Sequence, residues 1–263
     1  LGLYMMLPLV LKIFTPNISL FLVDNWGFAA SYTVSIILIA IALILLITLK
    51  IDFTAGVKKE KKKFSWNNII AVEAFLPTLS NIFTGMVFTA VIMNIVVYGD
   101  AMGFGQIALF MTFYNGAQVA TRGLGGYLAD KIGIRRTMYP CLILMIVTVA
   151  ILGSTDNFTM VLVAAVLFAI GFGGAQPVMT AVCMRTVSRE RAGAANATYM
   201  LGADVGTMIA STVVGVLIDA FGFQQMYLYM IIPGVMALLT FALTMKVMGK
   251  QIIAASRKEG AEE

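Results

Sequence analysis

Histidine is absent from this sequence of 263 residues, and cysteine occurs only twice. Without histidine the chain has no imidazole metal ligand, no histidine proton relay and no serine–histidine triad. Cys141 and Cys183 lie near the ends of apolar runs that we expect to face a reducing compartment, so buried thiols are expected rather than a disulfide. No glycine-rich phosphate loop precedes a Lys-Ser or Lys-Thr pair, which disfavours a process driven by ATP. We therefore expect no metal, no cofactor and no enzymatic activity.

Charge is scarce as well: 12% of the residues are charged and 60% are hydrophobic, and the mean hydropathy is +0.93. This composition excludes an ordinary soluble domain. Apolar runs long enough to cross a hydrocarbon core of about 30 Å recur along the chain. Eight are expected, near residues 1–22, 28–49, 67–98, 106–129, 137–153, 159–184, 193–218 and 226–247. The sequence thus predicts an all-α polytopic membrane protein with eight transmembrane helices.

The basic residues are sorted among the loops. Of the 18 Lys and Arg residues, all but Lys12 and Arg122 lie in four stretches, at 50–63, 131–136, 185–191 and 246–258. The loops that alternate with these stretches carry Asp24, Asp100, Asp156 and Asp219 instead. Because cytoplasmic loops collect Lys and Arg, we expect a multi-pass protein of the plasma (cytoplasmic or inner) membrane, with its basic loops and C-terminus in the cytoplasm. The net charge of +5 is therefore no sign of nucleic-acid binding.

A polar segment between two apolar runs, residues 126–136, reads Gly-Tyr-Leu-Ala-Asp-Lys-Ile-Gly-Ile-Arg-Arg. Its two glycines allow a tight reversal, and one acid with three bases can stabilise the adjoining helix ends. The segment resembles the signature loop of the major facilitator superfamily of secondary transporters, with Ile134 where a base is common. We expect a conformational gating loop made by Gly126, Asp130, Lys131, Gly133, Arg135 and Arg136.

A short internal repeat indicates the organisation of the chain. Residues 24–32, Asp-Asn-Trp-Gly-Phe-Ala-Ala-Ser-Tyr, match residues 219–227, Asp-Ala-Phe-Gly-Phe-Gln-Gln-Met-Tyr. Transporters of this superfamily resemble two six-helix bundles related by a parallel repeat, with this turn between the fifth and sixth helices of each. The expected parts are two helices of the first bundle (1–49), a basic cytoplasmic linker (50–66), the second bundle (67–250) and a cytoplasmic tail (251–263). About four helices are expected to precede Leu1.

Two further segments are similar to drug-exporting members of the superfamily. Residues 171–177, Gly-Phe-Gly-Gly-Ala-Gln-Pro, place small residues where helices can approach closely or bend. Residues 189–196 lead into a helix that contains Asp204-Val205-Gly206, similar to the exporters' Arg-x-Gly-x-Ala and Asp-x-Gly patterns. The exporters' glycine-and-proline motif of the fifth helix is only partly kept. The resemblance implies a drug-exporter-like transporter.

Four ionisable residues lie well inside the apolar runs, namely Lys12, Glu73, Arg122 and Asp204. Each costs about 2.5–3.5 kcal/mol near a helix centre, so each needs a partner or water. We expect Glu73, Arg122 and Asp204 to meet as a proton-coupling network; a structural ion pair, or snorkelling of Glu73 to the interface, is the alternative. Lys12 is expected near the bilayer midplane, where it either attracts an anionic substrate or pairs with an acid of the first bundle.

Polar residues also recur at helical spacing. Tyr114, Gln118 and Arg122 repeat every four residues, and Asn81 and Thr84 share a face with Glu73. Such stripes favour an aqueous substrate cavity, although hydrogen bonds between helices explain them too. The expected cavity residues are Lys12, Asn81, Tyr114, Gln118 and Gln176.

These observations predict a secondary active transporter that works by alternating access. Proton-coupled export of small, partly apolar compounds is the preferred function. Proton-coupled uptake of a metabolite, or a transporter-like sensor that binds without moving its ligand, is the alternative. The expected partners are a small-molecule substrate, protons and the lipid bilayer, and the protein is expected to be a monomer.

Overall fold

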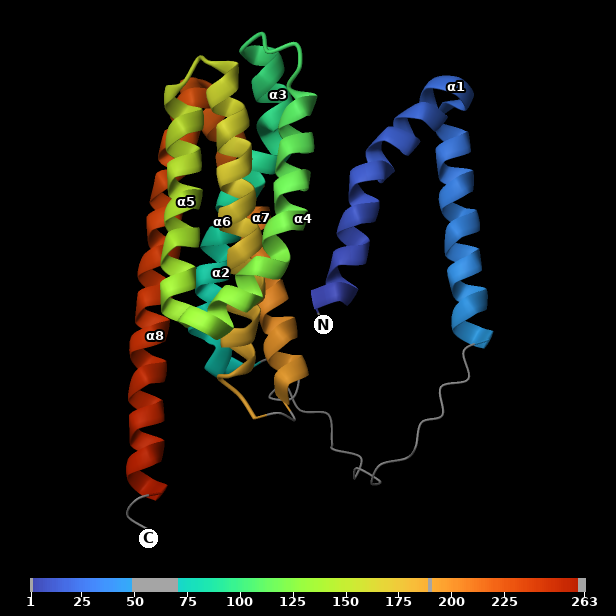
Figure 1. The fold of residues 1–263 in the computed structure, drawn as a ribbon. Coiled ribbons are helices and arrows are strands. Elements are labelled where there is room, and N and C mark those ends of the chain that lie inside the picture. The colour runs from blue at the N-terminus through green and yellow to red at the C-terminus, as the bar shows by residue number, and fades with distance from the viewer. Residues whose placement is uncertain (1, 49–70, 189–190, 260–263) are drawn as a thin grey trace. The chain divides into compact units, whose positions relative to one another are not determined.

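The computed structural model describes residues 2–48, 71–188 and 191–259, without the side chains of residues 2–17, 19, 20, 24, 122–126, 130 and 249–259. The described elements are all helices (Figure 1), which confirms the predicted all-α class. The chain divides into two units, Leu7–Phe64 and Ser65–Glu263 together with Leu1–Met6.

The helical part of the smaller unit is α1 (Gly2–Thr48) from Leu7 onward, and α1 consists of two helices joined at a kink. Gly27, with φ 76° and ψ 174°, breaks the helix, and Figure 1 shows the two arms meeting at this kink and spreading apart from it. Asn25 donates to the Phe21 carbonyl oxygen (2.8 Å) just before the kink. In the second arm, Thr33 and Ser35 donate to the carbonyl oxygens one turn earlier, so their hydroxyls stay satisfied inside an apolar helix.

The larger unit contains seven described α-helices: α2 (Phe75–Phe88), α3 (Asn94–Ala101), α4 (Ala108–Ile132), α5 (Ile134–Ser154), α6 (Phe158–Met184), α7 (Ala192–Tyr229) and α8 (Ile231–Glu259). A 3₁₀ turn, η2 (Val72–Ala74), precedes α2, and a π-helical turn, η3 (Thr89–Met93), joins α2 to α3. Gly222, with φ 80° and ψ 172°, breaks α7, so the chain from Phe223 onward leads into α8.

Five stretches of the described residues are long and apolar enough to cross a membrane: Asn25–Thr48, Val72–Ala101, Ile134–Ser154, Phe158–Met184 and Ala192–Met248. The last stretch has 57 residues and is divided at Gly222, so it is long enough for two crossings. Helix α4 is long enough at 25 residues, but its polar stripe lowers its hydropathy. The count of eight transmembrane helices stays a prediction.

Helix α2 packs chiefly against α7 and α8, whereas α6 packs against α4 and α5. Glycines set the closeness of these contacts. A Cβ atom on Gly206 of α7 would lie 2.2 Å from the Ile82 carbonyl oxygen of α2, and one on Gly202 would lie 2.7 Å from Thr78. The spacing of four residues places both glycines on the face of α7 that meets α2. Gly206, part of the exporter-like pattern, is therefore a packing residue.

The small residues of segment 171–177 also bring helices together, as their composition predicted. Gly171 faces α5, where an added Cβ would lie 2.7 Å from the Cys141 carbonyl oxygen. Gly173 faces α4, with Gln118 and Thr121 at 3.3 and 3.2 Å from the same position. Gly171 and Gly173 thus allow α6 to pack closely against α5 and α4.

Candidate transport site

The polar residue Asn81 lies in the interior of the larger unit, where α2, α6 and α7 meet. Its amide Nδ2 donates to the Tyr199 carbonyl oxygen (2.7 Å), and the Thr84 hydroxyl lies 3.2 Å from its Oδ1. A cavity of about 10 Å³ adjoins this cluster, lined in part by Thr84, Gln176 and Tyr199. This is roughly the space for one water molecule. In this structure Asn81 joins α2 to α7, and Gln176 borders the cavity.

Tyr199 is a residue of this cluster that the sequence interpretation missed. Its side chain is buried on α7. It lies three residues before Gly202 and seven before Gly206, so it shares their face. That spacing relative to the glycines is the signal that was available for finding it.

Tyr114 and Gln118 lie on one face of α4, as their spacing predicted. Both are buried, with 5% and 9% of their surface exposed. The Gln118 amide Nε2 donates to the Tyr114 hydroxyl (2.7 Å), and the Tyr114 ring lies 5.8 Å from that of Phe168 on α6. One turn further along, the Thr121 hydroxyl lies 3.3 Å from the Ala169 carbonyl oxygen. The stripe therefore faces α6; the side chain of Arg122, its third position, lies outside the described residues.

Glu73 forms an ion pair with Arg191, the residue that precedes α7. A second contact supports it, because the Thr198 hydroxyl accepts from the backbone N–H of Ala71 (2.9 Å). Together these bonds fasten the start of the α2 segment to the start of α7. The sequence had suggested Arg122 and Asp204 as the partners of Glu73, whereas the described partner is Arg191.

Asp204 lies further along α7. Thirteen residues separate it from Arg191, which is about 20 Å at 1.5 Å per residue. The structure therefore does not bring Glu73 and Asp204 together. The Asp204 side chain is exposed, between two glycines that face α2, and it contacts no other described side chain through a hydrogen bond or ion pair. A carboxylate thus stands in the middle of an apolar helix, on the side opposite the packed face.

In the expected gating loop, each described base has a different environment. Gly133, with φ 94°, ends α4 and begins α5. Arg135 donates from Nη2 to the Met245 carbonyl oxygen of α8 (2.9 Å). Lys131 lies over the Tyr127 ring, 5.6 Å from its centroid, and Arg136 is exposed. Gly126 lies within α4, whereas the side chains of Asp130 and Lys12 lie outside the described residues.

The comparison with known families agrees with this architecture. The family described as Major Facilitator Superfamily matches residues 78–262. The match begins in the first turn of α2 and includes all the described helices from α3 to α8. No curated protein matches the chain. Members of this family are transporters that bind small molecules in a membrane, and they are not enzymes in general. The match covers more than half of the chain, so this multi-pass membrane protein belongs to the major facilitator superfamily.

Proposed function

We propose that this protein exports small, partly apolar compounds in exchange for protons, by alternating access of two bundles about a midplane site. Membership of the family supports secondary transport. The direction, the coupling ion and the class of substrate are our proposal. So are the division into parts at residues 49, 66 and 250 and the cytoplasmic placement of the basic loops.

The observation that carries the proposal is the exposed carboxylate of Asp204. Its helix turns Gly202 and Gly206 toward α2, so the carboxylate stands on the outer side of the larger unit. An ionised carboxylate facing hydrocarbon costs about 2.5–3.5 kcal/mol near the bilayer centre. That side of α7 must therefore meet water or the first bundle. When the proposed substrate cavity closes around Asp204 during transport, a bound proton removes the free-energy cost of burying the charge of its carboxylate.

The remaining candidate residues take supporting roles in this proposal. Four polar residues lie behind the wall of the proposed substrate cavity: Tyr114, Gln118, Asn81 and Gln176. In this proposal, a rearrangement between helices exposes them to substrate. Arg122 is the proposed charge partner of Asp204, and Lys12 the proposed contact for an anionic substrate group. Glu73, held by Arg191, stabilises one end of the bundle and stands aside from the proton path.

The test uses the full-length protein reconstituted in vesicles of known orientation, with a panel of partly apolar compounds that begins with ethidium. A proton gradient that is more acidic on the side opposite the basic loops should drive the compound away from the side of the basic loops. Movement in the same direction as the protons would identify an importer instead. Saturable binding without flux under either gradient would identify a sensor and contradict transport.

A further inference from the structure

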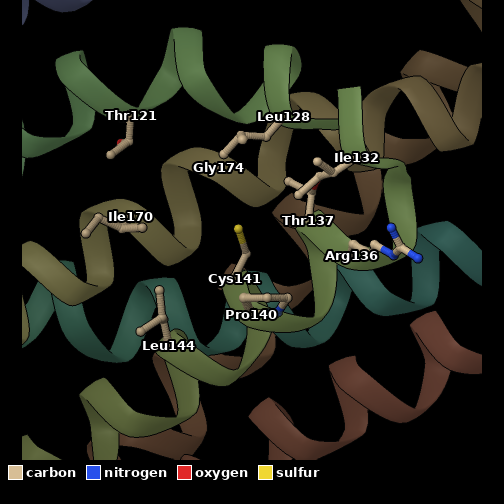
Figure 2. Close-up of a pocket in the computed structure, with 10 residues that line it drawn as sticks. All are labelled: Thr121, Leu128, Ile132, Arg136, Thr137, Pro140, Cys141, Leu144, Ile170 and Gly174. Carbon is tan, nitrogen blue, oxygen red and sulfur yellow. The ribbon is translucent and has the colours of Figure 1, made fainter. Parts of the chain in front are cut away.

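A groove of about 250 Å³ lies among α4, α5 and α6, beside the Gly133 turn (Figure 2). Its wall is almost entirely apolar and includes Leu128, Ile132, Leu144 and Ile170. Figure 2 shows Arg136 and Ile132 at the end next to the turn and Leu144 and Ile170 at the other end. No residue of the proposed Asp204 site belongs to this groove.

The groove runs along the helices and not across them. On α5 its lining extends from Arg136 to Leu144, eight residues or about 12 Å of helix. On α4 it extends from Thr121 to Ile132, about 16 Å. Leu128 and Ile132 are both exposed at its edge, with 38% and 42% of their surface accessible. The groove therefore has the direction and the open side that a hydrocarbon chain lying parallel to the helices requires.

A positive charge at one end of the groove indicates that the occupant carries a negative group. Arg136 lines this end and is exposed, and it forms no hydrogen bond or ion pair with the described residues. Its neighbour Arg135 is already engaged by the Met245 carbonyl oxygen of α8. An apolar groove that ends in an exposed guanidinium complements an amphiphile with one acyl chain in the groove and an anionic group at its head.

We infer that this groove binds one acyl chain of an anionic phospholipid, whose phosphate pairs with Arg136. Membership of a membrane-protein family makes phospholipid a molecule that surrounds this protein. The identity of the leaflet as the cytoplasmic one rests on the proposed topology, but the binding itself does not. An anionic surface attracts basic residues, and one such residue accounts for a preference of about fivefold for anionic over zwitterionic lipid.

The experiment compares neighbouring tryptophan reporters in the full-length protein, with Trp26 and Trp66 replaced by phenylalanine. Leu144→Trp places a reporter in the groove wall, and Ile143→Trp places one outside it on an exposed position of the same helix. The vesicles consist of phosphatidylcholine with a fixed fraction of a brominated lipid, whose chains quench tryptophan. This brominated lipid is phosphatidylglycerol in one set of vesicles and phosphatidylcholine in the other. We expect L144W to be quenched with about fivefold preference for the anionic lipid and I143W with no preference.

Adding Arg136→Gln to L144W should remove the preference, whereas Arg185→Gln, at an exposed base outside the groove, should leave it intact. Equal quenching of L144W by both lipids overturns the inference. Absence of quenching by either lipid also overturns it, because the groove is then covered by protein. If L144W does not fold, Leu128→Trp, in the same wall on α4, gives the same comparison.

Discussion

Gly27 and Gly222 adopt nearly the same backbone conformation, with φ and ψ of 76° and 174° at the first and 80° and 172° at the second. Each lies in a segment of the form Asp-x-x-Gly-Phe, where one helix ends and the next begins. Residues other than glycine are strained in this region of conformational space. The shared geometry supports the proposal that residues 24–32 and 219–227 are equivalent turns of two related bundles.

Replacement of Gly222 by alanine should destabilise the protein through torsional strain alone, because no atom lies within 4 Å of the position of an added Cβ. The expected loss is about 1–3 kcal/mol, measured as a lower midpoint of thermal unfolding in detergent. Gly215→Ala is the matched control, since Gly215 lies in the regular part of α7 and also has open space around it. That change should be neutral or stabilising. Equal midpoints for the two variants would contradict the assigned turn.

Gly206→Ala tests the close approach of α7 to α2. The added Cβ would lie 2.2 Å from the Ile82 carbonyl oxygen, which is backbone and cannot move aside without shifting the helix. Overpacking of this kind costs about 1–3 kcal/mol or more. We expect a lower unfolding midpoint and less folded protein, with Gly215→Ala again unchanged. A G206A protein as stable as the parent would show that the two helices are further apart.

The Glu73–Arg191 ion pair predicts which charges are coupled. In a double-mutant cycle, the unfolding free energies of Glu73→Gln and Arg191→Gln should be non-additive by about 0.2–1 kcal/mol, the range of partly exposed pairs. A second cycle combines Glu73→Gln with Asp204→Asn and should be additive, because Asp204 lies thirteen residues, or about 20 Å of helix, beyond Arg191, the partner of Glu73. Coupling in the second cycle and additivity in the first would restore the network expected from sequence.

Much of the fold could be predicted because the lengths of the apolar runs and the glycine-containing turns depend only on residues that are close together in the sequence. The apolar runs locate the helices, and the repeated Asp-x-x-Gly-Phe segments mark Gly27 and Gly222 as breaks. The expected spacing of Tyr114 and Gln118 also corresponds to one buried face of α4. These features depend on neighbouring residues and on the period of one helix.

The partners of the charges could not be predicted in the same way. The sequence favoured a network in which Glu73 and Asp204 meet, but the pairing of Glu73 depends on how the start of the α2 segment meets the residue before α7. Rotation of each helix about its axis decides which side chains meet, and a single sequence leaves that rotation open. Tyr199 was missed because its only signal is its spacing from Gly202 and Gly206, and the packing role of these glycines becomes visible only in the structure.

The topology proposal predicts opposite labelling of two loops. In a protein with Cys141→Ser and Cys183→Ser, single cysteines at Asp100 and Arg185 both stand at exposed positions of the larger unit. An impermeant maleimide added to intact cells should label Asp100→Cys directly and Arg185→Cys only after permeabilisation. The reverse pattern would invert every helix, and labelling of both from outside would overturn the alternation of loops.

The central claim, that Asp204 carries the coupled proton, is tested most directly by proton flux in vesicles of the full-length protein. Asp204→Asn is compared with Asp219→Asn, which makes the same chemical change at another exposed position of α7, close to the Gly222 turn. An internal pH dye reports proton movement driven by a gradient of the panel compound that the parent protein moves fastest. We predict that D204N still binds this compound but loses proton flux at least tenfold, while D219N retains it. Proton flux of D204N equal to that of D219N would contradict the account.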